Sequence, residues 1–261
     1  VATRPIQDYE AYQDSLKRYM SHTGMFMRPV FATAKAAPDA AKRVVFAEGE
    51  DERVLRAVQA AIDEHMVLPI LIGRPAVIDE RIEKAGLHIH RDKDFECVDP
   101  INDPRVEAYG QAYHRFMARE GVAPRAARAA VHRSSTILGA MMVREGHASA
   151  LICGTLGRFD QHLDHVRDVI GVAPGCHDFA TMNALMLEQH TLFIADTFVN
   201  EEPSAEQLAE IARMAADEVQ RFGMPAKVAF VSHSMYGSST RASARRMRAA
   251  RDLFVQRAPD I

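Results

Sequence analysis

Residues 44–73, VVFAEGEDERVLRAVQAAIDEHMVLPILIG, predict a strand, a helix and a second strand in succession. The apolar runs Val44–Ala47 and Pro69–Ile72 have the length of buried strands, and Gly73 ends the second one. Between them, residues 51–65 carry apolar side chains at helical spacing, namely Val54, Leu55, Val58, Ala61 and Ile62. This order is typical of two parallel strands joined by a right-handed crossover.

The same alternation continues along the chain. Further strands are predicted at residues 150–153, 182–187, 192–195 and 228–231, with one or two short strands between residues 87 and 98. Helices are predicted at residues 75–85, 103–120, 125–131, 136–145, 161–170, 204–222 and 241–257. The pattern predicts an α/β fold with two lobes, each built on a doubly wound and mostly parallel sheet. We expect residues 38–145 to form the first lobe and residues 146–261 the second, with Gly146 at the division.

An N-terminal arm, residues 1–37, is expected to precede the lobes. Residues 5–20 predict an amphipathic helix with four large side chains near one face, namely Tyr9, Tyr12, Leu16 and Tyr19. This helix packs either on its own domain or on an upstream domain or second subunit. Residues 21–38 are expected to be an irregular linker, with a short helix over residues 29–37 as the alternative. Because the chain starts at Val1 and stops at Ile261 directly after a helical pattern, we expect a fragment of a longer protein.

Composition narrows the classes of function. The 261 residues are 48% hydrophobic and 26% charged, which is ordinary for a globular protein. The net charge of −3 provides no basic field for nucleic acid or an acidic membrane. No apolar run approaches the length of about 20 residues that a membrane span needs. The three cysteines form no C-x-x-C pair, and we expect reduced packing thiols in a cytoplasmic protein, namely Cys97, Cys153 and Cys176.

A serine-rich loop, residues 232–240 (SHSMYGSST), is the first candidate ligand site. It follows a predicted strand and leads into a helix, whose free N–H groups and dipole favour a bound anion such as phosphate. The candidate contacts are Ser232, Ser234, Gly237, Ser238, Ser239 and Arg241. The helix that follows places Arg241, Arg245 and Arg248 on one face. The alternative is an ordinary capped loop beside a solvated basic face.

The loop after residues 150–153 is the second candidate. Gly154 and Gly157 allow a ligand to approach the backbone, and Arg158 and Arg167 have the charge to neutralise a phosphate or a developing oxyanion. His162 and His165 lack the third ligand of a metal motif, so we expect no metal site and assign both histidines to the surface or to helix capping.

Two further loops follow predicted strands. The acidic residues Glu50, Asp51 and Glu52 lie at a helix N-terminus, where the helix dipole favours them and where they would repel a phosphate. Asp196, after the strand at 192–195, either accepts a hydrogen bond from a substrate or caps a turn. The chain lacks the G-x-G-x-x-G fingerprint of dinucleotide binding.

Three segments in order resemble the phosphate acetyltransferase and phosphate butyryltransferase family: VVFAEGEDER at 44–53, IADTFVN at 194–200 and FGMPAKVA at 222–229. The match runs from about Lys42 to Ala258. Residues 70–75 (ILIGRP), 153–163 (CGTLGRFDQHL) and 232–239 (SHSMYGSS) are closer to one branch, the C-terminal domain of large bacterial NADP-dependent malic enzymes.

The resemblance implies a domain that binds acetyl-CoA or CoA between its lobes, regulates the oxidative decarboxylation of malate and assembles as a homo-oligomer, a dimer or larger. Its other partner would be its own malic enzyme domain, which would carry NADP and a divalent metal. The alternative is an active acetyltransferase, in which CoA thiolate attacks acetyl phosphate. Residues 157–160 replace the family's His-Ser-Thr run, and Tyr236 replaces a lysine, so the regulatory interpretation is favoured. Arg167 is the best counterpart of the family's arginine in that loop.

Overall fold

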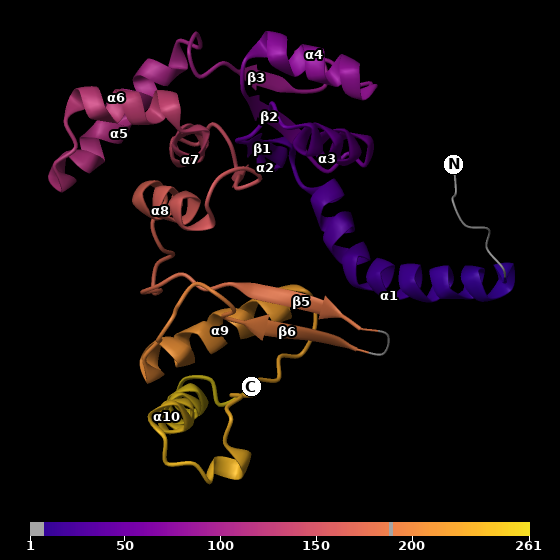
Figure 1. The fold of residues 1–261 in the computed structure, drawn as a ribbon, viewed down its shortest axis with the longest axis vertical. Coiled ribbons are helices and arrows are strands. Elements are labelled where there is room, and N and C mark those ends of the chain that lie inside the picture. The colour runs from indigo at the N-terminus through magenta and orange to yellow at the C-terminus, as the bar shows by residue number, and fades with distance from the viewer. Residues whose placement is uncertain (1–7, 188–189) are drawn as a thin grey trace. The chain divides into compact units, whose positions relative to one another are not determined.

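The computed structural model describes residues 8–187 and 190–261 (Figure 1). It contains two compact units, which we treat separately. Residues 31–171 form one, the four-stranded unit. The described residues among 8–30 and 172–261 form the other, the hairpin unit. The division expected at Gly146 falls inside the four-stranded unit, because strand β4 (Ala150–Ile152) pairs with that unit's first strand.

The four-stranded unit is built on a parallel sheet. Its strands are β1 (Arg43–Phe46), β2 (Leu68–Ile72), β3 (Glu96–Val98) and β4, in the spatial order β3-β2-β1-β4. Val45 lies between Ile70 on β2 and Leu151 on β4, and Leu71 is opposite Cys97 on β3. The α/β fold with a mostly parallel sheet that the sequence predicts is therefore confirmed.

Helices cover both faces of this sheet, which explains why its strands are apolar throughout. The helices are α2 (Asp39–Lys42), α3 (Glu52–Asp63), α4 (Pro75–Ala85), α5 (Arg105–Met117), α6 (Pro124–Arg133), α7 (Ser135–Arg144) and α8 (Phe159–Val169). On one face, Phe46 and Leu71 pack with buried side chains of α3 and α4. On the other face, Val45 and Ile70 pack with α5, α6 and α7, and α7 is buried over most of its length.

Local sequence signals set the ends of several helices. Asp51 caps α3, since its carboxylate accepts a hydrogen bond from the backbone N–H of Arg53. Ser134 caps α7 in the same way through the N–H of Ile137. Gly86 ends α4 with a left-handed φ of 65°, a conformation that glycine adopts without strain.

The N-terminal helix is longer than expected. Residues 5–7 lie outside the described residues, and α1 runs from Tyr9 to Ala36. The segment 21–38 was expected to be irregular, with a short helix over residues 29–37 as the alternative. The irregular prediction is wrong for residues 21–28, and over residues 29–36 the helical alternative is the one that forms. Pro29 lies inside the helix, where a proline removes one backbone hydrogen bond. The methionines and alanines around it are good helix formers, which explains why the helix continues past the proline.

The hairpin unit departs from parallel pairing. Its strands β5 (Met182–Met186) and β6 (Thr191–Ala195) are antiparallel. Only residues 187–190 connect them, and a parallel crossover needs a dozen residues or more. The general prediction of parallel strands is therefore wrong for this pair.

Two α-helices follow these strands in the hairpin unit, α9 (Ala205–Arg221) and α10 (Ala242–Arg257). The capping box predicted for Ser204 and Gln207 is present. The strand predicted at Val228–Val231 is not formed. Residues 224–232 have no regular secondary structure, so the backbone pairing that defines a strand is missing there. Residues 226–231 line an apolar cavity of about 290 Å³ beside β6 and α9.

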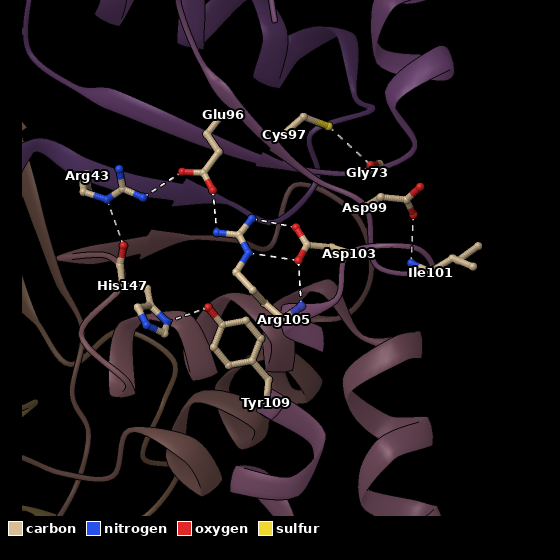
Figure 2. A network of polar contacts seen from close by, with 10 residues as sticks. All are labelled: Arg43, Gly73, Glu96, Cys97, Asp99, Ile101, Asp103, Arg105, Tyr109 and His147. Atoms are coloured by element: carbon tan, nitrogen blue, oxygen red, sulfur yellow. Dashed lines mark hydrogen bonds and ion pairs between the residues drawn. The ribbon is translucent and has the colours of Figure 1, made fainter. Parts of the chain in front are cut away.

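A charged network closes the amino-terminal edge of the parallel sheet (Figure 2). Glu96 at the start of β3 accepts hydrogen bonds from Arg43 (2.8 Å) and Arg105 (2.6 Å), and Arg105 also pairs with Asp103. Burial opposes the charge on Glu96, but the hydrogen bonds from Arg105 and Arg43 outweigh it and lower the pKa of this carboxyl. The network ties β1, β3 and α5 together at the edge opposite the carboxyl ends of the strands.

Candidate functional site

A cavity of about 530 Å³ opens at the carboxyl ends of β1 and β4 in the four-stranded unit. In open α/β sheets, ligands bind at this edge. The polar side chains that line the cavity are Glu48, Arg133, Ser134, Ser135, Thr136, Gln161, His162 and His165. Ser134 and Ser135 are at the N-terminus of α7, where unpaired N–H groups and the helix dipole favour an anion. Together with Arg133, this end of the cavity has the chemistry to hold a phosphate or a carboxylate.

The wall of the cavity is the loop between β4 and α8, and three side chains hold its backbone. Glu48 Oε1 accepts a hydrogen bond from the N–H of Gly154 at 3.0 Å. Arg53 donates to the carbonyl of Thr155 at 3.2 Å, and His162 donates to the carbonyl of Leu156 at 2.6 Å. The loop is therefore fixed by residues from the β1–α3 loop, from α3 and from α8.

His162 is bound through both ring nitrogens. Nε2 lies 2.6 Å from the Leu156 carbonyl oxygen, and Nδ1 lies 2.8 Å from Thr136 Oγ1. Thr136 is only 2% exposed, so this hydroxyl is part of the interior. The sequence-based assignment of His162 to the surface or to a helix cap is wrong, because the imidazole joins α7 to the loop.

Cys153, at the base of the same loop, is a protonated thiol near neutral pH. Burial raises its pKa, the nearby Glu48 carboxylate adds to the effect, and a hydrogen bond with Thr136 only partly opposes it. Burial also lowers the pKa of His165, which lines the cavity as well. A high thiol pKa disfavours the thiolate that a nucleophile requires.

A second cavity of about 300 Å³ adjoins the first, and Glu48, Arg133, Ser135 and Leu156 line both. The acidic loop Glu48–Asp51 forms one side of it. Glu50 accepts hydrogen bonds from the backbone and the side chain of Arg74, and this interaction lowers the pKa of Glu50. The acidic residues of this loop are therefore used largely for helix capping and ion pairing, in line with the dipole argument.

The two arginines predicted for this loop point to neighbouring carboxylates. Arg158 pairs with Asp160, and 80% of its side chain is exposed. Arg167 lies 3.3 Å from Asp164 one turn earlier in α8, and 47% of its side chain is exposed. The polar side chains from this part of the sequence that line the cavity are instead Gln161, His162 and His165.

In the hairpin unit, the serine-rich loop binds its own backbone. Ser234 Oγ accepts a hydrogen bond from the N–H of Ser239 at 2.9 Å, and Ser232 Oγ accepts one from the N–H of Ser234 at 3.1 Å. Arg248 donates to the carbonyls of Gly237 and Ser239. These hydroxyls and this guanidinium thus organise the loop.

The remaining predicted contacts lie at the same end of that loop. Ser238 is exposed after the short 3₁₀ helix Met235–Gly237, and Arg241 is the exposed N-cap residue of α10. The Arg241 N–H donates to Ser239 Oγ at 3.2 Å. One amide at the start of α10 is thereby capped by the loop itself.

Asp196 caps the turn that follows β6. Its carboxylate accepts hydrogen bonds from the N–H of Val199, from the N–H and side chain of Asn200, and from the N–H and hydroxyl of Thr181. Burial alone would raise its pKa, but the hydrogen bonds from Asn200 and Thr181 lower it. Of the two roles that the sequence left open for Asp196, the geometry supports the turn cap.

Arg133, Ser135 and Thr136 were missed by the sequence reasoning. That reasoning searched the loops after strands, whereas these residues end one helix and begin the next: Arg133 is the last residue of α6, and Ser135 and Thr136 are the first two of α7. A signal was present: the run Ser134-Ser135-Thr136 directly precedes the apolar stretch Ile137–Val143. Such a run is typical of a helix N-terminus.

Among residues 8–187 and 190–261, no group of three or more His, Cys, Asp or Glu side chains is placed to hold a metal ion. Across the same residues, none of the helices is both long and apolar enough to span a membrane.

The parallel sheet with a cavity at the carboxyl ends of its strands can now be compared with known protein families. The sequence model of the phosphate acetyl/butaryl transferase family matches residues 25–261, nearly the whole chain. The chain therefore belongs to this family.

Within that family, the chain is similar to one part of bacterial malic enzymes. It is 48% identical over all 261 residues to the NAD-dependent malic enzyme of Rhizobium meliloti (strain 1021). It is also 48% identical over 261 residues to the NADP-dependent malic enzyme of Salmonella typhimurium (strain LT2). It covers 34% of each, so it spans about one third of the length of these relatives. The resemblance predicted from the sequence is confirmed, and it includes NAD-dependent as well as NADP-dependent relatives.

A solved structure, the EutD phosphotransacetylase from Staphylococcus aureus, has the same fold. The TM-score is 0.77 over 90% of this chain and 70% of that chain, at 24% sequence identity. At this identity the comparison supports the architecture and leaves the ligand to be inferred from the site.

Proposed function

We propose that this chain is the CoA-binding regulatory part of a malic enzyme. The observation that carries the proposal is the cavity beside α7, which combines Arg133, a helix N-terminus and several hydroxyls at the ligand-binding edge of a parallel sheet. These groups suit the phosphates of CoA, because guanidinium groups and helix N-termini both bind phosphate oxygens. The proposed ligand is acetyl-CoA or CoA.

Regulation requires that the ligand binds one conformation of the whole protein better than another. The effect would be a change in the oxidative decarboxylation of malate, carried out by the other part of the protein with its own NAD(P) coenzyme and divalent metal. A homo-oligomer and contacts with that part belong to the same proposal. Asp196 acts as a turn cap in this proposal. The other ligand contacts predicted from the sequence stay predictions, namely Arg158, Arg167, Ser232, Ser234, Gly237, Ser238, Ser239 and Arg241.

The second candidate function is phosphate acetyl transfer, which membership of the family favours. CoA thiolate would attack the acetyl carbon of acetyl phosphate and release phosphate, and a base would have to accept the thiol proton. His162 is hydrogen-bonded at both nitrogens, and the pKa of the Cys153 thiol is raised, so neither side chain is suited to accept the thiol proton or to act as a thiolate. This geometry favours binding over catalysis.

One pair of measurements on the full-length protein separates the two functions. Calorimetry with acetyl-CoA tests binding, and an assay of acetyl-CoA formation from acetyl phosphate and CoA tests turnover. The regulatory proposal predicts saturable heat, a change in malate oxidation on adding acetyl-CoA, and no turnover above the uncatalysed rate. Turnover at about 1 s⁻¹ or faster, which is ordinary for enzymes, would refute it.

A further inference from the structure

His162 links the first turn of α7 to the loop between β4 and α8. Its two hydrogen bonds, to Thr136 Oγ1 at 2.8 Å and to the Leu156 carbonyl at 2.6 Å, join segments that are about 20 residues or more apart in the sequence. Since a carbonyl oxygen only accepts hydrogen bonds, Nε2 must carry a proton. In the neutral imidazole, Nδ1 then accepts a hydrogen bond from the Thr136 hydroxyl, so the ring is the Nε2–H tautomer.

The loop backbone packs directly against this ring. Gly157 has a φ of 98°, and a Cβ atom there would lie 2.9 Å from His162 Nε2. Gly154 has a φ of 95°, and its Cβ would meet His162 Cδ2 at 4.0 Å. Both glycines therefore have conformations that other residues rarely adopt, and at Gly157 a side chain would also displace the imidazole.

We propose that His162 is a positioning residue, which holds the backbone of residues 154–157 as the wall of the cavity and so determines the affinity for a CoA-type ligand. This inference rests on the proposed function. Because both ring nitrogens are already bound, the effect on the ligand passes through the loop. The Leu156 side chain, held by this loop, lies on the wall shared by the two cavities, so a shift of the loop changes both.

Two substitutions separate the two hydrogen bonds. The amide nitrogen of Gln in His162→Gln can replace Nε2 and keep the bond to Leu156, whereas Asn in His162→Asn can replace Nδ1 and keep only the bond to Thr136. We expect the loop to stay largely ordered with Gln and to loosen with Asn. The matched control is His90→Asn, at an exposed histidine in the same unit.

The first readout is hydrogen exchange of the amides of residues 154–158 in the full chain, followed by mass spectrometry. His162→Asn should accelerate this exchange about five- to tenfold relative to wild type, the amount that one lost hydrogen bond produces. His162→Gln should change it about twofold or less. The acetyl-CoA dissociation constant measured by calorimetry should follow the same order. Unchanged exchange in His162→Asn, or equal effects of Gln and Asn, would overturn the proposal.

Thr136 offers a second test that a general loss of packing does not imitate. Thr136→Ser keeps the hydroxyl and should preserve the Nε2–H tautomer of His162, seen in the ¹⁵N shifts of the ring. Thr136→Val removes the hydroxyl and should move the ¹⁵N shift of Nδ1 to that of a ring nitrogen without a hydrogen bond, while Nε2 stays protonated against the Leu156 carbonyl. If wild-type protein binds no CoA species, the proposed function fails while these loop measurements still report on His162. If Ser and Val behave alike, the positioning role fails whatever the ligand.

Discussion

The contact between Gly157 and His162 can be measured with a double-mutant cycle. Gly157→Ala forces a side chain into a φ of 98°, which costs about 1–2 kcal/mol. It also places Cβ 2.9 Å from His162 Nε2, and displacing the ring sacrifices the bond to Leu156, about 1 kcal/mol more. In a His162→Ala background only the φ cost remains. The expected coupling between the two substitutions is therefore about 1 kcal/mol.

Urea unfolding followed by far-UV circular dichroism gives the four free energies, because the chain has no tryptophan for fluorescence. The matched control is Gly86→Ala, at a φ of 65° with no atom within 4 Å of the added Cβ. This substitution should lower the unfolding free energy by about 1–2 kcal/mol, and by the same amount with His162 present or replaced by Ala. If Gly157→Ala also costs the same amount with and without His162, the imidazole does not support the loop and the reasoning is refuted.

Two further predictions concern the fold of the four-stranded unit. Gly139→Ala on α7 would place Cβ 2.6 Å from Leu151 Cδ1. The resulting overpacking should destabilise the protein by about 1–3 kcal/mol, which would be measured as a lower Tm. A neutral or stabilising result would contradict the tight packing of α7 on the sheet. In acid, Glu96 and Asp103 should lose their contribution to stability, because their pKa values are lowered in the folded state. That contribution is complete above the unfolded pKa of about 4 and disappears as pH falls through the lower folded pKa values. Arg105→Ala should therefore make the unfolding free energy depend less steeply on pH below about 4. An unchanged slope in this variant would contradict the role of the network.

Much of the four-stranded unit could be predicted from local sequence. Its strands are short apolar runs and its helices have clear periodicity and caps, so α4 has the predicted bounds of residues 75–85. These signals are local because each strand is covered on both faces and each helix on one. The four-residue connection between β5 and β6 was also visible and indicates a hairpin, a signal that the general alternation of strands and helices obscured.

Other features depend on contacts that no local pattern contains. The segment Val228–Val231 has the composition of a strand, but a strand exists only where a neighbour pairs with it. The same holds for the site. Thr136, Leu156 and His162 are separated in the sequence and meet only because α7, α8 and β4 pack together. Arg158 and Arg167 have the right charge, yet their neighbouring carboxylates determine where they point.

Calorimetric titration of the full-length protein with acetyl-CoA tests the central claim most directly, when wild type is compared with Arg133→Ala and with Arg125→Ala, an exposed arginine at the other end of α6. The account predicts saturable binding by wild type and Arg125→Ala, and about tenfold weaker binding by Arg133→Ala, because a charge-assisted hydrogen bond to phosphate is lost. Equal affinities for all three proteins, or no binding by any of them, would contradict a CoA site in the cavity beside α7.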